Sequence, residues 1–153
     1  MKEVIKKDLE SFLWTSNAIE GVYDDDSFRQ AKFAWKYLKK VKRLTLKDIL
    51  EIHRRMSIHS KLKSHERGFL RRCEVAVGGR LGLTYPLVPA AVDHWVMNVN
   101  NIVEEGKKEP QVFLERIIKE HHVKYEKIHP FIDFNGRTGR MLMNWERMLL
   151  DLP

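Results

Sequence analysis

The densest group of side chains capable of chemistry lies between residues 129 and 140, which read His-Pro-Phe-Ile-Asp-Phe-Asn-Gly-Arg-Thr-Gly-Arg. His129 and Asp133 belong to a loop that leads into a helix starting near Gly136. Because free N–H groups and the helix dipole attract anions at such a start, the segment predicts an anion-binding site. Asn135 is expected to cap this helix, and Gly136 lets a ligand approach the backbone closely.

Two arginines follow on the first turn of the same helix. Arg137 and Arg140 are neighbours on the helix surface, and each guanidinium can bind two phosphate oxygens. Cations are unfavourable near a helix N-terminus, which indicates that something negative binds there. Asp133 could hold a Mg²⁺ ion that bridges phosphate oxygens, and His129 is the group able to take a proton near neutral pH. The pattern predicts transfer of a phosphorus-centred group from a nucleotide to a hydroxyl. The alternative, an ordinary basic surface turn, is disfavoured by the order of the residues.

A second segment of interest lies at the N-terminus. Residues 3–20 have the apolar spacing of an amphipathic helix, and Gly21 is expected to end it. One face of this helix carries Leu9, Phe12, Leu13, Ser16 and Glu20. A carboxylate on an apolar face and near a helix C-terminus needs a cationic partner. The alternative is an ordinary terminal helix whose glutamate reaches solvent.

These segments must be positioned by the rest of the chain, which is predicted to be mainly helical. Ser27 is expected to cap a helix that extends to about residue 40, and Thr45 or Leu46 to open the next one. The further helices are expected after residue 90, over 110–128 and after 136. Pro130 should end the helix before it, since the residue preceding a proline disfavours the helical conformation. Between 72 and 89, alternating apolar residues around Gly78-Gly79 predict two short strands, the second extending through Leu83, Tyr85 and Leu87.

Composition limits the classes of protein. The 153 residues suit one domain, and 43% hydrophobic residues are enough for a core. No apolar run approaches the roughly 18–20 residues of a membrane span, and no signal-peptide pattern follows Met1. The single cysteine, Cys73, excludes an internal disulfide and a multi-cysteine zinc site. The net charge of +7 indicates an anionic partner: nucleic acid, a nucleotide or a phospholipid headgroup.

Some features are assigned no chemistry. His121 and His122 lack the i, i+4 spacing of a helical zinc pair, so packing or support of His129 is favoured. The basic run from Lys39 to Arg43, together with Arg54-Arg55 and Arg71-Arg72, could be a nucleic-acid patch. These charges are expected to be solvated instead, because no aromatic-interleaved motif supports nucleic-acid binding. The tryptophans lie in helical apolar stripes and are expected to be core or packing residues: Trp14, Trp35, Trp95 and Trp145.

The segment 129–140 resembles the Fic motif, His-Pro-Phe-x-Asp/Glu-Gly-Asn-Gly-Arg-x-x-Arg, at eleven of its twelve positions. The departure is Phe134, which stands where the family has glycine. The resemblance extends over about residues 45–150 and includes His122, Ile128 and the segment 142–144. It implies a Fic-type helical bundle with one short β-hairpin flap.

The resemblance also implies an activity, which is transfer of AMP from ATP to a Tyr, Thr or Ser hydroxyl of a target protein. His129 would be the catalytic base and Asp133 the Mg²⁺ ligand. Asn135 and the backbone of Gly136 would surround the α-phosphate, while Arg137 and Arg140 would hold the outer phosphates. The implied nucleotide-binding residues are Phe134, Asn135, Gly136, Arg137, Thr138, Gly139 and Arg140. The target would lie extended along the hairpin from Val75 to Val88, as an added strand.

The segment from Ser16 to Gly21 resembles the inhibitory Ser/Thr-x-x-x-Glu-Gly/Asn element of the same family. By this resemblance Glu20 pairs with Arg140 and denies it to the γ-phosphate, while Ser16 helps to fix the helix. Residues 1–22 would then be an inhibitory helix attached to a Fic core over 23–153, within one globular domain. The missing export signal and the family's common setting favour the bacterial cytoplasm, and a homo-oligomer is left open.

Phe134 leaves alternatives open. Its ring either points away from the nucleotide or crowds the α-phosphate, and a positive φ would cost about 1–2 kcal/mol. The chain could therefore be a degenerate Fic module that binds nucleotide or protein, or an enzyme that uses another donor or also removes AMP. The chain ends soon after the motif, at Pro153, which predicts a minimal or truncated core.

Overall fold

The computed structural model describes the backbone of residues 2–153 and the side chains of residues 11–153. The α-helices in that range are α1 (Lys2–Ile19), α2 (Asp25–Leu38), α3 (Leu46–Ser57), α4 (Val88–Glu105), α5 (Gln111–Ile128) and α6 (Asn135–Leu149). Two short strands, β1 (Ala76–Val77) and β2 (Arg80–Leu81), form the hairpin, and 3₁₀ turns cover Tyr85–Leu87 and Gly106–Lys108. The predicted mainly α fold with one hairpin is confirmed.

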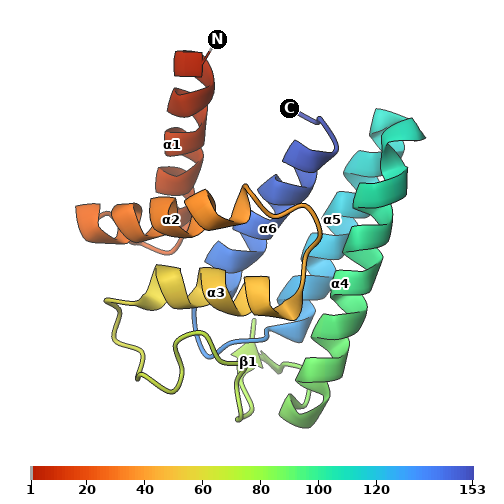
Figure 1. Ribbon diagram of the computed structural model, residues 1–153. Coiled ribbons are helices and arrows are strands. Elements are labelled where there is room, and N and C mark those ends of the chain that lie inside the picture. The colour runs from red at the N-terminus through yellow and green to blue at the C-terminus, as the bar shows by residue number, and fades with distance from the viewer. Residues whose placement is uncertain (1) are drawn as a thin grey trace.

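Helix α6 lies at the centre of the bundle and contacts α1, α3, α4 and α5. In Figure 1, α2 and α3 lie one above the other in front of α6, and α4 and α5 run beside it. The indole of Trp145 is fully buried on α6, and its Nε1 donates to the carbonyl of Val41 at 2.9 Å. The second half of the motif, residues 135–140, therefore forms the first turns of this central helix.

Side-chain capping fixes two helix starts. Thr45 and Asp48 form a reciprocal capping box at α3, which confirms the predicted start of this helix. The predicted cap at Ser27 is wrong, because Asp24 caps α2 instead. The Asp24 carboxylate accepts both the backbone N–H of Ser27, at 2.8 Å, and its hydroxyl, at 2.9 Å. A carboxylate has acceptors for both donors, so Ser27 lies inside the first turn.

The hairpin is shorter than predicted. Gly78 and Gly79 have φ values of +54° and +79°, as a tight two-residue hairpin turn requires. Pairing joins Ala76 to Leu81 and Val77 to Arg80. The predicted second strand through Leu87 is wrong, since residues 85–87 form a 3₁₀ turn; Pro86 lacks the N–H that a strand ladder needs.

The predicted core is largely correct. Trp35, Trp95 and Trp145 are buried, whereas Trp14 is 38% exposed and contacts the edge of the Phe28 ring. Of the two predicted roles, core or packing, Trp14 has the second, since it packs against α2 at the surface. On the predicted apolar face of α1, Leu13 and Ser16 are buried, and Leu9 lies outside the described side chains.

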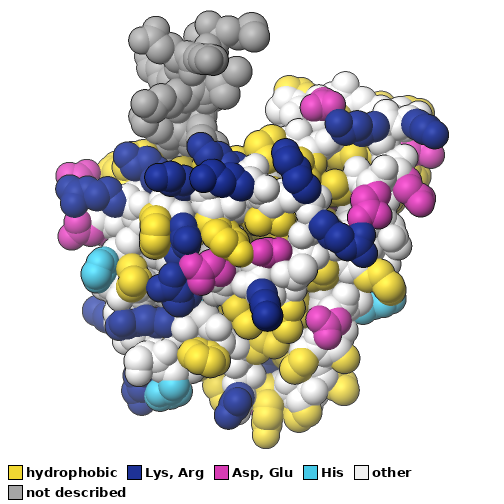
Figure 2. Space-filling model, in the orientation of Figure 1, with side chains coloured by type: hydrophobic (Ala, Val, Ile, Leu, Met, Phe, Trp, Pro, Cys, Tyr) yellow, Lys and Arg dark blue, Asp and Glu magenta, His cyan; other side chains and the backbone are white. Residues whose placement is uncertain are grey.

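The surface in Figure 2 shows Lys and Arg side chains over α2 and the loop after it, interspersed with acidic ones. Several of these charges are paired. Arg54 and Arg55 contact Glu51 at 2.7 and 2.8 Å, and Arg43 pairs with Glu104. Among the helices of residues 2–153, none is long and apolar enough to cross a membrane.

Candidate functional site

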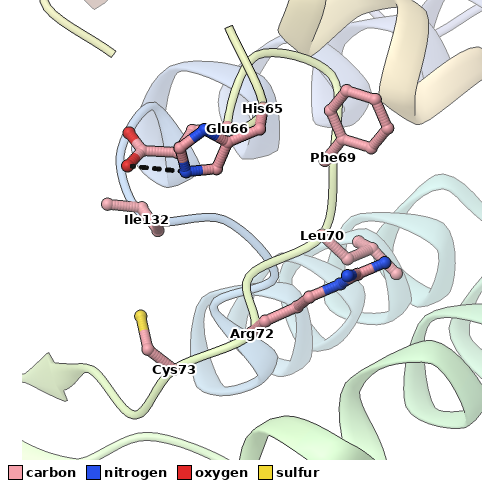
Figure 3. Close-up of a pocket in the computed structure, with 7 residues that line it drawn as sticks. All are labelled: His65, Glu66, Phe69, Leu70, Arg72, Cys73 and Ile132. Carbon is pink, nitrogen blue, oxygen red and sulfur yellow. Dashed lines mark ion pairs between the residues drawn. The ribbon is translucent and has the colours of Figure 1, made fainter. Parts of the chain in front are cut away.

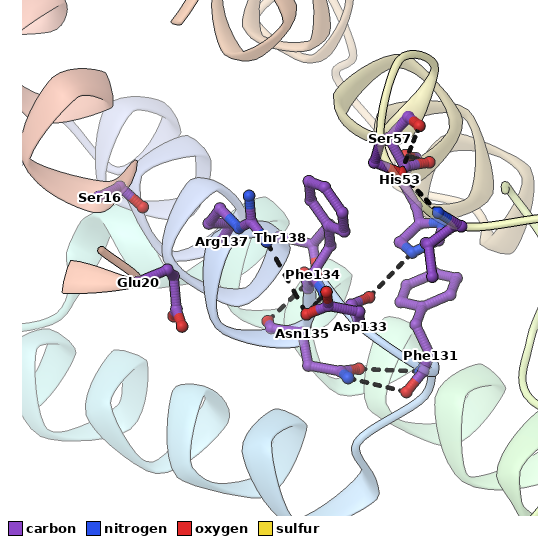
Figure 4. A network of polar contacts seen from close by, with 12 residues as sticks. Ser16, Glu20, His53, Ser57, Phe131, Asp133, Phe134, Asn135, Arg137 and Thr138 are labelled. Carbon is purple, nitrogen blue, oxygen red and sulfur yellow. Dashed lines mark hydrogen bonds and ion pairs between the residues drawn. The ribbon is translucent and has the colours of Figure 1, made fainter. Parts of the chain in front are cut away.

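A loop of six residues, 129–134, connects α5 to α6 and carries the chemistry-bearing side chains (Figure 4). Both of its ends adopt left-handed backbone conformations. His129 ends α5 with φ 49° and ψ 65°, and its N–H donates to the carbonyl of Tyr125 at 3.0 Å. Phe134 precedes α6 with φ 68° and ψ 17°. These two turns reverse the chain between antiparallel helices, so that His129 and the start of α6 face one cavity.

Asn135 does not cap α6, and this prediction is wrong. It is the first residue of the helix, and Phe134 occupies the cap position without a side-chain acceptor. The buried amide of Asn135 instead accepts the N–H of Phe131 and donates to its carbonyl, both at 2.8 Å. An amide matches a backbone N–H and C=O pair in this way, so Asn135 closes the loop on itself, and its second amide N–H is left for a ligand in the cavity that Asn135 lines.

His53, to which the sequence assigned no role, supports the loop from α3. The fully buried ring accepts the N–H of Gly68 at Nδ1, at 2.9 Å, so Nε2 carries the proton and donates to the carbonyl of Asp133 at 3.0 Å. The ring also stacks on Phe131, with 3.7 Å between centroids. Burial lowers the pKa of His53 to about 4, which keeps it neutral. His53 lies on the apolar face of α3, beside Ile52. A histidine on such a face could have indicated a buried polar contact from the sequence alone.

A cavity of about 240 Å³ joins the motif loop to the N-terminal helix. It is lined by Glu20, Glu126, His129, Ile132, Asp133, Phe134, Asn135, Gly136 and Arg140. Burial lowers the pKa of His129, and the carboxylate of Glu126 partly opposes this change. His129 is therefore neutral at pH 7, with Nδ1 buried and without a partner among the described groups. Glu126 belongs to this cavity although the sequence did not indicate it.

Glu20 and Arg140, 120 residues apart in the chain, meet in this cavity. The Arg140 Nη2 donates to Glu20 Oε1 at 2.9 Å and to the carbonyl of Ser16 at 3.0 Å, and its Nε donates to Ser16 Oγ at 2.9 Å. Gly21, with φ +71°, turns the chain directly after the pair. A Cβ atom at Gly136 would lie only 2.5 Å from Glu20 Oε1. The Glu20 carboxylate thus occupies the N-terminus of α6, where the sequence predicted an anion.

Three of the predicted nucleotide-binding residues, Arg137, Thr138 and Gly139, lie outside the cavity lining. Arg137 is 8% exposed, and its guanidinium lies flat against the ring of Phe134, 3.5 Å from the centroid. The hydroxyls of Thr138 and Tyr125 share a hydrogen bond of 2.8 Å. Gly139, without a side chain, lets α6 approach the ring of Tyr125. The structure therefore places Arg137 against the interior, and Thr138 and Gly139 in the contact between α5 and α6.

The ring of Phe134 points into the protein. It is 8% exposed and meets the edge of His53, with 5.9 Å between centroids, while Arg137 covers its other side. Of the two orientations considered from the sequence, the structure has the one in which the ring points away from the anion site.

Asp133 has the exposure expected of a metal ligand. Its side chain is 64% exposed, and Oδ1 accepts the N–H of Phe134 at 2.7 Å, which orients the carboxylate. Among the described residues, no cluster of three or more His, Cys, Asp or Glu side chains could hold a metal alone. One carboxylate together with substrate phosphates is a usual environment for Mg²⁺, so Asp133 fits this ion. His121, considered above for zinc, is instead bound to Glu146 at 2.6 Å.

A second cavity, of about 370 Å³, lies between the loop 129–134 and the segment that enters the hairpin (Figure 3). Its lining consists of His65, Glu66, Phe69, Leu70, Arg72, Cys73 and Ile132. Phe69 and Ile132 are 55% and 39% exposed. Because Ile132 also lines the first cavity, the two spaces adjoin on either side of the motif loop.

Comparisons with known proteins agree with this geometry. The model of the Fic/DOC family matches residues 43–146. The chain is 40% identical over 113 residues to the protein named "Protein adenylyltransferase Fic" of Aedes aegypti, which covers 72% of this chain and 21% of that protein. It is 32% identical over 152 residues to the protein of the same name from Drosophila ananassae, covering 94% of this chain and 29% of the relative. The chain thus spans less than a third of the length of these relatives.

A solved structure shows the same fold. A crystal structure of a Fic family protein from Desulfovibrio desulfuricans G20 superposes with a TM-score of 0.60, at 20% identity, over 90% of this chain and 41% of that one. The helical bundle with its short hairpin, predicted from the resemblance, is confirmed. With a family model over more than half of its length, and with the motif loop between α5 and α6, the chain belongs to the Fic/DOC family.

Proposed function

We propose that the protein is a self-inhibited protein adenylyltransferase, which transfers AMP from ATP to a Tyr, Thr or Ser hydroxyl of a target protein. The observation that carries this proposal is the position of the Glu20 carboxylate at the N-terminus of α6, bound to Arg140. A carboxylate held where backbone N–H groups and a guanidinium converge is a substitute for a phosphate. The names of the relatives support adenylyl transfer as the reaction.

His129 acts as the general base in this proposal. Burial keeps the imidazole neutral, and because Nδ1 is buried, Nε2 is the nitrogen that takes the proton from the target hydroxyl. The hydroxyl oxygen then bonds to the α-phosphorus of ATP, the bond from that phosphorus to the bridging oxygen breaks, and pyrophosphate leaves. The helix N-terminus beside Gly136 stabilises the charge that develops on the α-phosphate.

Arg140 holds the outer phosphates once Glu20 releases it. Its side chain is 16% exposed, and among the described residues its hydrogen bonds to the N-terminal segment go to Ser16 and Glu20. While these contacts persist, a γ-phosphate cannot form the same bonds, so the donor is not aligned for attack. Residues 1–22 thereby act as an inhibitory element on the core formed by residues 23–153.

Mg²⁺ would be held by Asp133 together with phosphate oxygens. The ion would neutralise charge on the transferred group and on the pyrophosphate. Arg137, covered by Phe134 and 3.8 Å from Asp133 Oδ1, contributes positive charge from behind the loop.

The target would add an extended segment to the edge of the hairpin between Val75 and Val88. Backbone pairing with a strand edge positions a hydroxyl with little demand on the target sequence. The cavity beside Ile132 and Phe69 lies on the same side and would take a neighbouring apolar side chain of the target.

The alternative of a degenerate binding module rests on Phe134. The orientation of its ring into the interior removes the expected clash with the α-phosphate and so favours the enzyme. Calorimetry with ATP and Mg²⁺ tests binding separately from transfer. Absence of ATP binding to the Glu20→Gly protein would refute both the enzyme and a nucleotide-binding module.

The test of transfer is auto-modification of the purified protein, followed by intact-mass spectrometry after incubation with ATP and Mg²⁺. Glu20→Gly and Glu20→Gln are both expected to gain AMP at least tenfold faster than wild type, since a lost hydrogen bond between charged groups is worth about 1.5–3 kcal/mol. Glu20→Gln is the matched control for shape, because it keeps the side chain and removes the charge. Equal rates in all three proteins would contradict self-inhibition. AMP found only on a Phe134→Gly protein would favour the binding module.

A further inference from the structure

The guanidinium of Arg71 is buried among backbone carbonyls beside the site. Arg71 is 3% exposed, so the prediction that its charge is solvated is wrong. Its Nε donates to the carbonyl of His129 at 2.6 Å, Nη1 to that of Cys73 at 2.8 Å, and Nη2 to those of Leu83 and Ile128 at 2.5 and 3.1 Å. Among the ion pairs of the described side chains, none involves Arg71. Four carbonyl dipoles therefore offset the charge in place of a carboxylate.

Two of these bonds cap the C-terminus of α5. The last carbonyls of a helix lack partners within it and favour a positive charge nearby. Arg71 supplies both a donor and a charge to Ile128 and His129, and its own backbone N–H donates to the carbonyl of Pro130 at 2.9 Å. The left-handed backbone of His129 is unfavourable for a residue with a Cβ, so these bonds hold it in place.

The other two bonds hold the hairpin. Cys73 precedes β1 and Leu83 follows β2, so one side chain contacts both legs of the flap. The two strands of the hairpin have two residues each and, among the described elements, pair only with each other. Nη2 bridges the two groups directly, since it donates to Leu83 and to Ile128.

We infer that Arg71 is a positioning residue that fixes the flap relative to the backbone of His129. This inference rests on the proposed function, in which the flap carries the target hydroxyl and His129 takes its proton. The geometry requires a guanidinium, because a planar fork with five N–H donors can reach carbonyls in two directions at once. A lysine ammonium at this position would keep the charge but, with three N–H donors on a single atom, could not replace all four bonds, and methionine would keep only the volume.

The test compares Arg71→Met and Arg71→Lys, each in the Glu20→Gly protein, with Asn100→Ala in the same background. Asn100 is the matched control, because its buried amide also holds two backbone groups, the N–H and carbonyl of Leu44, far from the motif. Auto-modification at saturating ATP should fall on the order of a hundredfold in Arg71→Met and less in Arg71→Lys, as expected for a misplaced reacting group. The affinity for ATP should stay within about twofold, because Arg71 does not line the nucleotide cavity. Asn100→Ala should lose stability and keep its rate.

Hydrogen exchange gives a readout that does not depend on activity. The N–H of His129, bonded to Tyr125, and the N–H of Gly82, bonded to Val75, should both lose protection in the Arg71 variants and keep it in Asn100→Ala. Should Arg71→Met fail to fold, Arg71→Lys gives the decisive comparison. Either folded Arg71 variant with an unchanged rate, or with both amides protected as before, would overturn the inference. If Glu20→Gly itself transfers no AMP, the proposed function fails, while the exchange of the two amides still tests the role of Arg71.

Discussion

Replacement of Phe134 by glycine separates two opposing effects at the centre of the motif. The left-handed backbone, with φ 68°, costs a residue with a Cβ about 1–2 kcal/mol, which glycine would relieve. The ring, however, is 8% exposed and lies between His53 and Arg137, and removal of a buried phenylalanine costs about 3–5 kcal/mol. Packing outweighs strain, so Phe134→Gly should lower the free energy of unfolding by about 1–4 kcal/mol.

Phe134→Ala is the control that isolates the strain. Alanine loses the ring but keeps the Cβ at positive φ, so it should be less stable than Phe134→Gly by about 1 kcal/mol. Urea unfolding followed by fluorescence measures the free energy of unfolding of the three proteins, provided that the denaturant slopes agree. A Phe134→Gly protein more stable than wild type would show that strain dominates. Equal stability of the glycine and alanine variants would contradict the left-handed conformation at this residue.

Further predictions concern the inhibitory contact and two histidines. Ser16→Ala removes one acceptor of Arg140 and should raise auto-modification about fivefold, less than Glu20→Gly, as measured by mass spectrometry. His53 binds a proton more readily unfolded than folded, so the free energy of unfolding should fall by about 3 kcal/mol as pH drops from 6.5 to 4. Urea titrations of His53→Gln should lack this part of the pH dependence. Because burial lowers the pKa of His129, the rate of the Glu20→Gly protein should fall at acid pH with a midpoint below the ordinary histidine value of about 6.5, and a midpoint above it would contradict the buried, neutral base.

Much of the helical framework could be predicted from the sequence, because apolar spacing and caps are local signals. Thr45 marked the start of α3, and Pro130 marked the end of α5. The order of residues 129–140 placed an imidazole, a carboxylate and a helix start together, and the structure brings His129, Asp133 and Gly136 to one cavity.

Contacts between distant segments could not be predicted in this way. The side-chain amide of Asn135 can equally well cap a helix or bond to the backbone of a loop. Only the turn of the loop brings the backbone of Phe131 within its reach. The direction of Arg137 depends on the ring of Phe134, which departs from the family pattern. His53 and Arg71 bind backbone carbonyls 80 and 58 residues away, and carbonyls carry no sequence signal.

The central claim is that this chain transfers the adenylyl group of ATP with His129 as the base. The most direct measurement incubates Glu20→Gly and Glu20→Gly/His129→Ala proteins in parallel with ATP labelled on the α- or the γ-phosphate. If His129 is the base for adenylyl transfer, the Glu20→Gly protein incorporates the α-label and not the γ-label, and the His129→Ala change abolishes incorporation. Incorporation of the γ-label, or of the α-label at the same rate without His129, would contradict it.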